Sequence, residues 1–272
     1  MIHYYGMRLG IESFLKGRIT REAIKNVIVP ANYWRTLEYR LTFDALSATP
    51  ADRILDVGSP KLLSFYLADR VGAEVYSTDI EDYFVPDYVA FRSMRKIPES
   101  RFRPLRADGR QLPFPDSHFT RAYAISVLEH VPGTGDADCM RELARTLAPG
   151  GICALTVPFS PKSRDEFKRP KEFYWSQASV ESGNPSMVFY QRRYSENDLE
   201  TRLVLPSGMR LKKLLYLGDR LPLKDGREVA DYLPPITGPL HPLMSKLFHS
   251  TPSDSWEKMT KPLGAFLVLQ KP

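Results

Sequence analysis

Three acidic residues stand where carboxylates could bind a ligand. Asp56 lies in the apolar stretch RILDV, Asp79 ends EVYSTD, and Asp108 ends FRPLRAD. Carboxylates accept hydrogen bonds from hydroxyl and amino groups, so they suit a ligand with a ribose diol and an adenine amine. A single acid at a strand end more often caps a helix or is solvated in a loop. The interpretation therefore depends on the joint placement of three acids at one edge of a sheet, where ligands of open parallel sheets bind.

A second group of candidate residues follows the stretch RAYAIS, residues 121–126. It consists of Ser126, Val127, Glu129 and His130. An imidazole can serve as a general base in proton transfer. A lone histidine is more often a hydrogen-bonded structural residue, so His130 is a candidate catalytic base and Glu129 a weaker one.

The elements that must position these residues follow an alternating pattern. Apolar segments predict strands at 53–57, 74–79, 102–108, 121–126, 152–159, 209–218 and 264–270, and helical patterns cover 20–29, 34–45, 60–70, 135–147 and 195–205. Thr20 is expected to cap the first of these helices, and Ser195 with Asp198 to form a capping box for the last. Strands that are apolar throughout and separated by helices indicate an α/β fold, with a parallel sheet covered on both faces.

The chain divides into a helical segment at 1–50, expected to act as a lid or to pack on the core, and a larger domain at 51–272. Two inserts interrupt that domain, at 160–194 and 219–263. Loops of this length inside a compact domain are usually functional. The first insert is basic and aromatic, which is either a solvated charged loop or a site for an anionic acceptor or carrier. The second is rich in proline, and we expect it to cover an apolar substrate rather than contact a membrane surface.

Composition limits the class of protein. The chain has 272 residues, 43% of them hydrophobic, with a net charge of +6 and only two cysteines, Cys139 and Cys153. No apolar run approaches the roughly 20 residues of a transmembrane helix. We expect a soluble cytoplasmic protein with two reduced, buried thiols. The mild positive charge by itself argues against a nucleic-acid partner.

Four stretches together resemble a known family. LDVGSP, STDIED, ADGRQLPFPDSHFTRAYAISVLEHV and LARTLAPGGICALTVPF are similar to the class I S-adenosylmethionine-dependent methyltransferases, in their type-11 branch. The resemblance covers roughly residues 50–160, and its most specific part is the run from Asp108 to Val131. It implies a doubly wound, Rossmann-like, mostly parallel sheet of seven strands with a final antiparallel strand.

The resemblance also implies roles for individual residues. The loop from Asp56 through Gly58 to Ser59, together with Ser126 and Val127, would face the methionine part of S-adenosylmethionine. Asp79 would bind the ribose hydroxyls, and Ile80 would pack on the adenine. Asp108 would accept from the adenine amine beside Gly109, and His130 would stand near the reacting methyl. S-adenosylhomocysteine would be the product.

The loop after the first strand departs from the family pattern. Pro60 and Leu62 occupy positions where the family usually has glycine. Ser59 and Pro60 suit the N-cap and first position of a helix, so we expect a helix that starts early and whose free N–H groups still face the cofactor.

The implied reaction is direct displacement at the methyl, with an oxygen or nitrogen of a small-molecule or carrier-linked acceptor as nucleophile. Three alternatives remain open: a non-catalytic binding or scaffold protein of this fold, an RNA methyltransferase, and a nicotinamide-dependent oxidoreductase. The last would need Gly-x-Gly-x-x-Gly where this chain has Gly58-Ser59-Pro60-Lys61-Leu62-Leu63.

Overall fold

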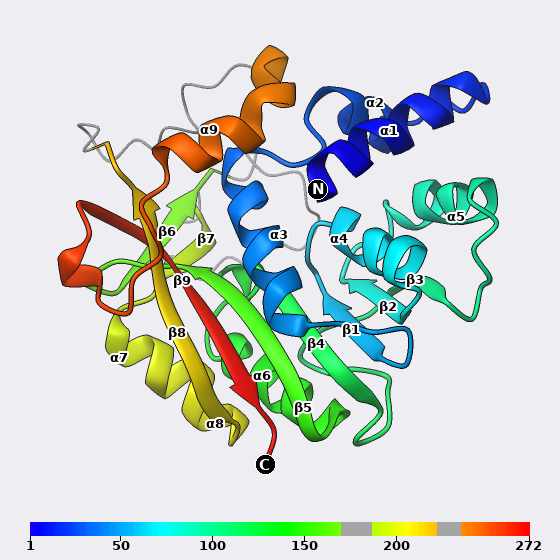
Figure 1. Ribbon diagram of the computed structural model, residues 1–272. Coiled ribbons are helices and arrows are strands. Elements are labelled where there is room, and N and C mark those ends of the chain that lie inside the picture. Colours follow the sequence, from blue (N-terminus) through cyan, green and yellow to red (C-terminus); the bar gives the residue numbers. More distant parts are fainter. Residues whose placement is uncertain (170–186, 222–234) are drawn as a thin grey trace.

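The protein is built on one seven-stranded sheet (Figure 1). The computed structural model describes residues 1–169, 187–221 and 235–272. In sheet order the strands are β3 (Phe102–Arg106), β2 (Glu74–Asp79), β1 (Arg53–Val57), β4 (Phe119–Ile125), β5 (Leu147–Pro158), β9 (Lys261–Gln270) and β8 (Arg210–Asp219). The first five are parallel, and β9 runs antiparallel to both of its neighbours. The predicted fold class, including the antiparallel final strand, is confirmed.

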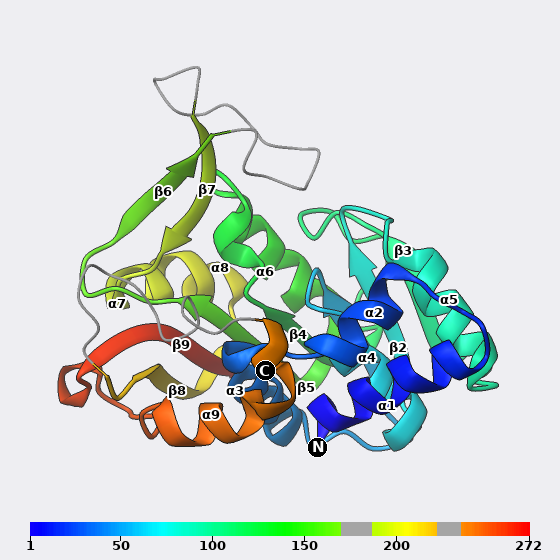
Figure 2. The ribbon, with the colours of Figure 1, turned by 90° about the horizontal axis from the view of Figure 1, so that it is seen from above.

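Helices cover both faces of this sheet (Figures 1 and 2). They are α1 (Ile2–Leu15), α2 (Arg21–Ile28), α3 (Tyr33–Leu46), α4 (Leu62–Tyr66) continued by a π-helical turn Leu67–Val71, α5 (Val85–Met94), α6 (Gly135–Thr146), α7 (Glu196–Asp198) continued by a π-helical stretch Leu199–Val204, α8 (Leu205–Ser207) and α9 (His241–Phe248). Short 3-10 turns occupy Leu128–His130, Pro235–Leu240 and Trp256–Lys258. The predicted cap at Thr20 and the capping box of Ser195 and Asp198 are both present.

The core has two halves because neighbouring residues of a strand point to opposite faces. Ile54 of β1 belongs to the half beneath α1, α3, α4 and α5. Leu55, the next residue, belongs to the half beneath α6, with Met140 and Leu143. Cys139 and Cys153 are buried, unbridged thiols in the second half, as predicted.

Helix α3 packs directly against the sheet. Leu37 and Leu46 are buried in the first half of the core, and Figure 1 shows α3 lying across β4 and β5. This part of the segment 1–50 is therefore a layer of the fold and contributes to the sheet edge described below.

The first insert is more ordered than the sequence predicted. Within 160–194, where we expected an irregular loop, β6 (Arg164–Lys168) and β7 (Val188–Arg193) form an antiparallel hairpin. Residues 170–186 of this insert lie outside the described residues, as do residues 222–234 of the second insert, which otherwise contains α9.

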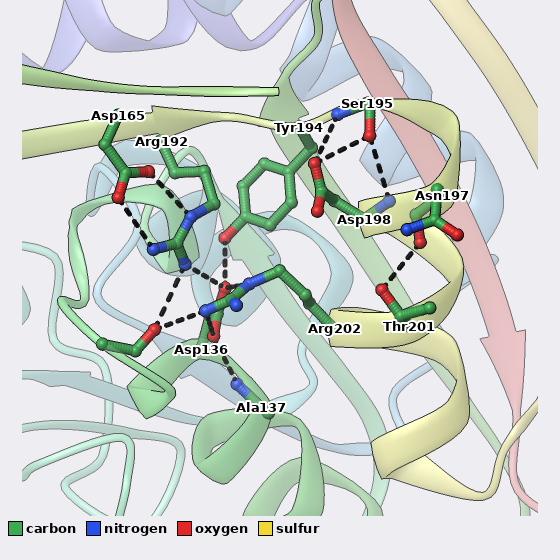
Figure 3. A network of polar contacts seen from close by, with 11 residues as sticks. Asp136, Ala137, Asp165, Arg192, Tyr194, Ser195, Asn197, Asp198, Thr201 and Arg202 are labelled. Carbon is green, nitrogen blue, oxygen red and sulfur yellow. Dashed lines mark hydrogen bonds and ion pairs between the residues drawn. The ribbon is translucent and has the colours of Figure 1, made fainter. Parts of the chain in front are cut away.

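The hairpin is fixed to the domain by a buried carboxylate (Figure 3). Asp136 of α6 accepts hydrogen bonds from Arg192 at 3.0 Å, from Arg202 at 2.8 Å and from the Tyr194 hydroxyl at 2.9 Å. Its side chain is fully buried. A buried carboxylate of this kind is stable only while its cations remain, so the hairpin, α6 and the helix containing Arg202 are held as one unit.

Candidate functional site

The loops after β1, β3 and β4 meet at the carboxyl edge of the sheet. β1 lies between β2 and β4, so the loops that follow these strands are neighbours. A Cβ on Gly58 would lie 2.6 Å from Val127 Cγ1, and one on Gly109 would lie 2.9 Å from Val57 Cγ1. Gly58 also has φ of +65°, which side chains rarely adopt. Glycine is therefore required at 58 and 109 for these loops to approach one another.

Asp56 organises the first loop from inside. Its carboxylate is fully buried and accepts from the Ser59 amide at 3.1 Å, from Ser77 Oγ at 2.8 Å and from Ser64 Oγ. Burial raises the pKa of Asp56, opposed by the ammonium of Lys61. The loop backbone, rather than this carboxylate, is the part able to face a ligand.

The helix after this loop starts later than predicted. α4 begins at Leu62, and Ser59 does not cap it. Its hydroxyl instead accepts a hydrogen bond of 2.8 Å from the backbone amide of Ile125 in β4. This tertiary contact ties the loop to the neighbouring strand, and Pro60 lies before the helix instead of at its first position.

Lys61 links the first two acids, which the sequence did not predict. Its Nζ lies 3.2 Å from Asp79 Oδ2, 3.8 Å from Asp56 Oδ2 and 2.7 Å from the Thr78 carbonyl oxygen. The ammonium also lies 4.7 Å from the centre of the Phe84 ring. The Lys61 side chain is 5% exposed and that of Asp79 is 17% exposed. The lysine therefore holds Asp79 from its buried side.

Asp79 keeps acceptor capacity toward solvent. One of its oxygens contacts Lys61, and the other accepts from the Glu81 amide at 3.2 Å. A carboxylate oxygen has two lone pairs, so both can still accept a hydroxyl. Ile80 follows at the edge, its carbonyl oxygen accepting from Arg106 at 2.9 Å.

Asp108 follows β3 and is paired with Arg110. The guanidinium donates two bonds to the Asp108 carboxylate, at 2.7 and 3.0 Å, and this pairing lowers the pKa of Asp108. The carboxylate is partly exposed. It is ionised and held in one orientation, next to Gly109.

Ser126 is engaged by α3, the second contact that the sequence did not predict. Ser126 has φ of +49°, and its hydroxyl donates to Glu38 Oε1 at 2.8 Å. Thr156 at the end of β5 donates to the same oxygen at 2.7 Å, and Arg35 donates to Glu38 Oε2. Glu38 is 1% exposed. Helix α3 thus fixes the ends of β4 and β5 through one buried carboxylate.

His130 and Glu129 form an adjacent pair after β4. His130 Nδ1 lies 2.7 Å from the Tyr190 carbonyl oxygen. A carbonyl only accepts, so Nδ1 carries the proton and Nε2 is the basic nitrogen. Nε2 lies 3.8 Å from Glu129 Oε1, and burial lowers the pKa of His130.

Glu129 is a buried acid with one unsatisfied oxygen. Among the described residues its Oε2 has no hydrogen-bond partner, and the side chain is 2% exposed. Burial raises the pKa of Glu129 to about 8. Glu129 is therefore mainly protonated at neutral pH, next to the basic nitrogen of His130.

The basic residues of the β6–β7 hairpin are largely neutralised within the hairpin. Arg164 and Arg193 pair with Glu166, and Arg192 pairs with Asp165 as well as Asp136. These pairs give the solvated-charge explanation a structural basis in the described part of the insert. The same described residues contain no cluster of three or more metal-ligating side chains and no helix long and apolar enough to cross a membrane.

Comparisons with known proteins point to one family. Residues 55–155 match the family described as "Methyltransferase domain". The chain is 25% identical over 194 residues to a demethylmenaquinone methyltransferase of Mycolicibacterium vanbaalenii, covering 66% of this chain and 75% of that protein. It is 32% identical over 124 residues to the ubiquinone/menaquinone biosynthesis C-methyltransferase UbiE of Ectopseudomonas mendocina, covering 44% of this chain and 47% of that protein.

Solved structures agree with the fold. A geranyl diphosphate C-methyltransferase from Streptomyces coelicolor superimposes with a TM-score of 0.57 at 13% identity, covering 88% of this chain and 76% of that one. The [4+2]-cyclase SpnF gives a TM-score of 0.53 at 18% identity, covering 88% and 82%. At these identities the likeness concerns architecture alone, and one fold can serve different chemistries.

Proposed function

This chain belongs to the class I S-adenosylmethionine-dependent methyltransferases, and on that premise we propose that it methylates a small apolar acceptor by direct displacement. The observation that carries the proposal is the meeting of the β1, β3 and β4 loops at one sheet edge, with Asp79 still able to accept hydroxyl hydrogen bonds. S-adenosylmethionine supplies the activated methyl group when bound.

The residues of this edge fit that cofactor. Asp79 would accept from the ribose hydroxyls, and Ile80 would cover the adenine. Asp108, held by Arg110, would accept from the adenine amine beside Gly109. The loop Asp56–Ser59 through Gly58, with Ser126 and Val127, would hold the methionine end. In this arrangement Asp56 and Glu38 act from behind, by fixing the two loops.

The chain's own contribution to the reaction is alignment, exclusion of water and proton removal. His130 Nε2 would take the proton from the acceptor, since the Tyr190 carbonyl holds the proton on the other nitrogen. Protonated Glu129 at 3.8 Å would stabilise the neutral imidazole by hydrogen bonding after a small rotation. If His130 is the base, His130→Ala lowers turnover and leaves cofactor affinity unchanged.

Two relatives bear names of quinone-pathway methyltransferases, and one of them of a C-methyltransferase. We therefore include an activated ring carbon, beside oxygen and nitrogen, among the atoms to test as nucleophile. Hydroxylated aromatic rings with an apolar tail are the first acceptor class to supply, with labelled methyl donor and detection of labelled product.

The decisive experiment is calorimetric titration with S-adenosylmethionine and S-adenosylhomocysteine, with NADH as control. Micromolar binding of either sulfur ligand, and none of NADH, supports the proposal. Asp79→Ala should then weaken binding at least about tenfold, because hydrogen bonds to a charged acceptor contribute roughly 1.5–3 kcal/mol each. A folded protein that binds neither sulfur ligand would favour the scaffold alternative, for which the unusual Pro60–Lys61 loop is the specific observation.

A further inference from the structure

Exposed apolar side chains of this protein are concentrated on three helices. Among the described residues, 16 large hydrophobic side chains are exposed, and 11 of them fall in residues 1–28 and 240–247. They are Met1, Tyr4, Ile11, Phe14, Leu15, Ile19, Ile24, Ile28, Leu240, Leu243 and Leu247. Scattered exposed leucines are normal, but a concentration of this kind marks an interaction surface.

The pattern on α9 is the reverse of an ordinary surface helix. His241 and Ser245 point into the protein and are buried, while Leu243 and Leu247 are 54% and 53% exposed. Leu240, just before the helix, extends the same stripe and is 52% exposed. A helix that faces only water would place its leucines inward.

Helix α1 presents a similar stripe. Its residues 2, 5, 9 and 13 are buried, and Tyr4, Ile11 and Leu15 follow one another on the outer side. Leu15 is 82% exposed. Of the residues on this outer stripe, Arg8 is the charged one, and it pairs with Glu12.

These helices form one continuous surface. The 3-10 turn before α9 packs on the end of α2 so closely that a Cβ on Gly238 would lie 1.8 Å from the Ile28 carbonyl oxygen. At the start of α1, His3 bonds the Ala31 carbonyl oxygen at 3.0 Å, next to the same turn. Figures 1 and 2 show α1, α2 and α9 together on one side of the molecule, in the second view facing the reader.

This surface lies over the edge of the sheet that carries the site. His249, directly after α9, bonds Asp219 at 3.0 Å, and Tyr33 at the start of α3 bonds the same carboxylate at 2.7 Å. Asp219 ends β8, which runs parallel to β5 because both are antiparallel to β9. The α9 end of the surface is therefore anchored at the carboxyl edge.

The charge of the surface selects its partner. Five cations on and between α1 and α2 are exposed, namely Arg8, Lys16, Arg18, Arg21 and Lys25, and Lys246 is exposed on α9. The two acids of residues 1–32 are turned inward: Glu22 is buried, and Glu12 pairs with Arg95 at 2.8 Å. Leucines, isoleucines and a tyrosine bordered by lysine and arginine are the composition of helices that lie in a lipid headgroup layer.

We propose that α1, α2 and α9 form a docking surface for an anionic lipid bilayer, on which the protein lies with its site edge toward the membrane. The surface exists whatever reaction the site performs. Together with the proposed function, it indicates that the apolar acceptor is drawn from the bilayer.

Vesicle flotation tests this with the full chain and without cofactor. Vesicles of phosphatidylcholine with about 30% phosphatidylglycerol should carry the protein upward, phosphatidylcholine alone should carry much less, and 0.5 M salt should release it. Leu243→Ser with Leu247→Ser should weaken binding at least about tenfold, because two leucines no longer enter the acyl region. Leu205→Ser with Leu211→Ser, exposed on other elements, is the matched control and should bind as the wild type does.

Circular dichroism and S-adenosylhomocysteine titration of the same variants separate the two proposals. A Leu243/Leu247 variant that is folded, binds this ligand as well as the wild type does and fails to float supports the surface. Absence of flotation for the wild type, or equal loss in the Leu205/Leu211 control, overturns it. So does a wild-type dimer that the Leu243/Leu247 variant converts to monomer, since a second copy would then be the occupant. Failure to bind S-adenosylhomocysteine in every variant would instead count against the proposed function and leave the flotation result intact.

Discussion

Lys61 Nζ lies 3.2 Å from Asp79 Oδ2, inside the loop where glycines were expected. The lysine is nearly buried and its ammonium also lies near Asp56, so one cation joins the acid that orders the loop to the acid proposed to hold the ribose. The loop is therefore built differently from a glycine-rich one. Its rigidity comes from charge pairing and from the Ser59–Ile125 hydrogen bond.

Lys61→Met should weaken S-adenosylhomocysteine binding about tenfold, because Asp79 loses the cation that orients its carboxylate. Calorimetry measures the dissociation constant, and exposed Lys162→Met is the control. An analogue that lacks the ribose 2′-hydroxyl should lose less affinity in the variant than the full ligand does. Equal losses for both ligands would show that Lys61 acts on the fold in general and not through Asp79.

Gly58→Ala should lower both cofactor affinity and the free energy of unfolding, the latter by about 1–3 kcal/mol. The added methyl meets Val127 at 2.6 Å, and φ of +65° is unfavourable for alanine. Gly150→Ala separates the two effects, since Gly150 has φ of +78° and nothing within 4 Å of the added Cβ. Denaturant unfolding of both variants provides the comparison. If Gly58→Ala is no more destabilising than Gly150→Ala, the contact with Val127 is not the limiting one.

The acids and glycines of the site could be predicted because they lie directly after strands, where local pattern and topology determine their place. Glu38 could not, since its hydrogen bond to Ser126 joins residues 88 positions apart and a glutamate within a helix is ordinarily solvated. The late start of α4 has a similar cause. Ser59 has the right type for a cap, but a tertiary donor, the Ile125 amide, takes its hydroxyl oxygen. The β6–β7 hairpin was missed because its strands are charged on alternate residues and owe their order to Asp136 and Glu166.

Asp136→Ala should destabilise the protein by about 3–5 kcal/mol, because the guanidinium of Arg192 would remain buried without a partner that replaces this carboxylate. Asp138→Ala, two residues away and exposed, is the matched control. Thermal unfolding measures both. Cleavage by trypsin within the hairpin should also become faster in the Asp136 variant, and an unchanged cleavage rate would contradict the role given to this network.

Glu129→Gln should change how stability depends on pH. The pKa of Glu129 in the folded protein is raised to about 8 from an ordinary value near 4.5. Between these two values the folded protein keeps a proton that the unfolded chain has lost, so the contribution of Glu129 is complete below about pH 4.5 and disappears as pH rises through 8. Within this window the free energy of unfolding falls by up to about 1.4 kcal/mol per pH unit from this group alone. Glutamine resembles the protonated acid and does not titrate, so the stability of the variant relative to the wild type should rise steadily from pH 5 to pH 8. Urea unfolding at pH 5, 6.5 and 8 measures that difference, in which titrations common to both proteins cancel. Exposed Glu200→Gln should show a nearly constant difference over the same range. A constant difference for Glu129→Gln as well would mean that water or a neighbouring cation keeps this carboxylate ionised, and Glu129 could then not serve as the hydrogen-bond donor to His130.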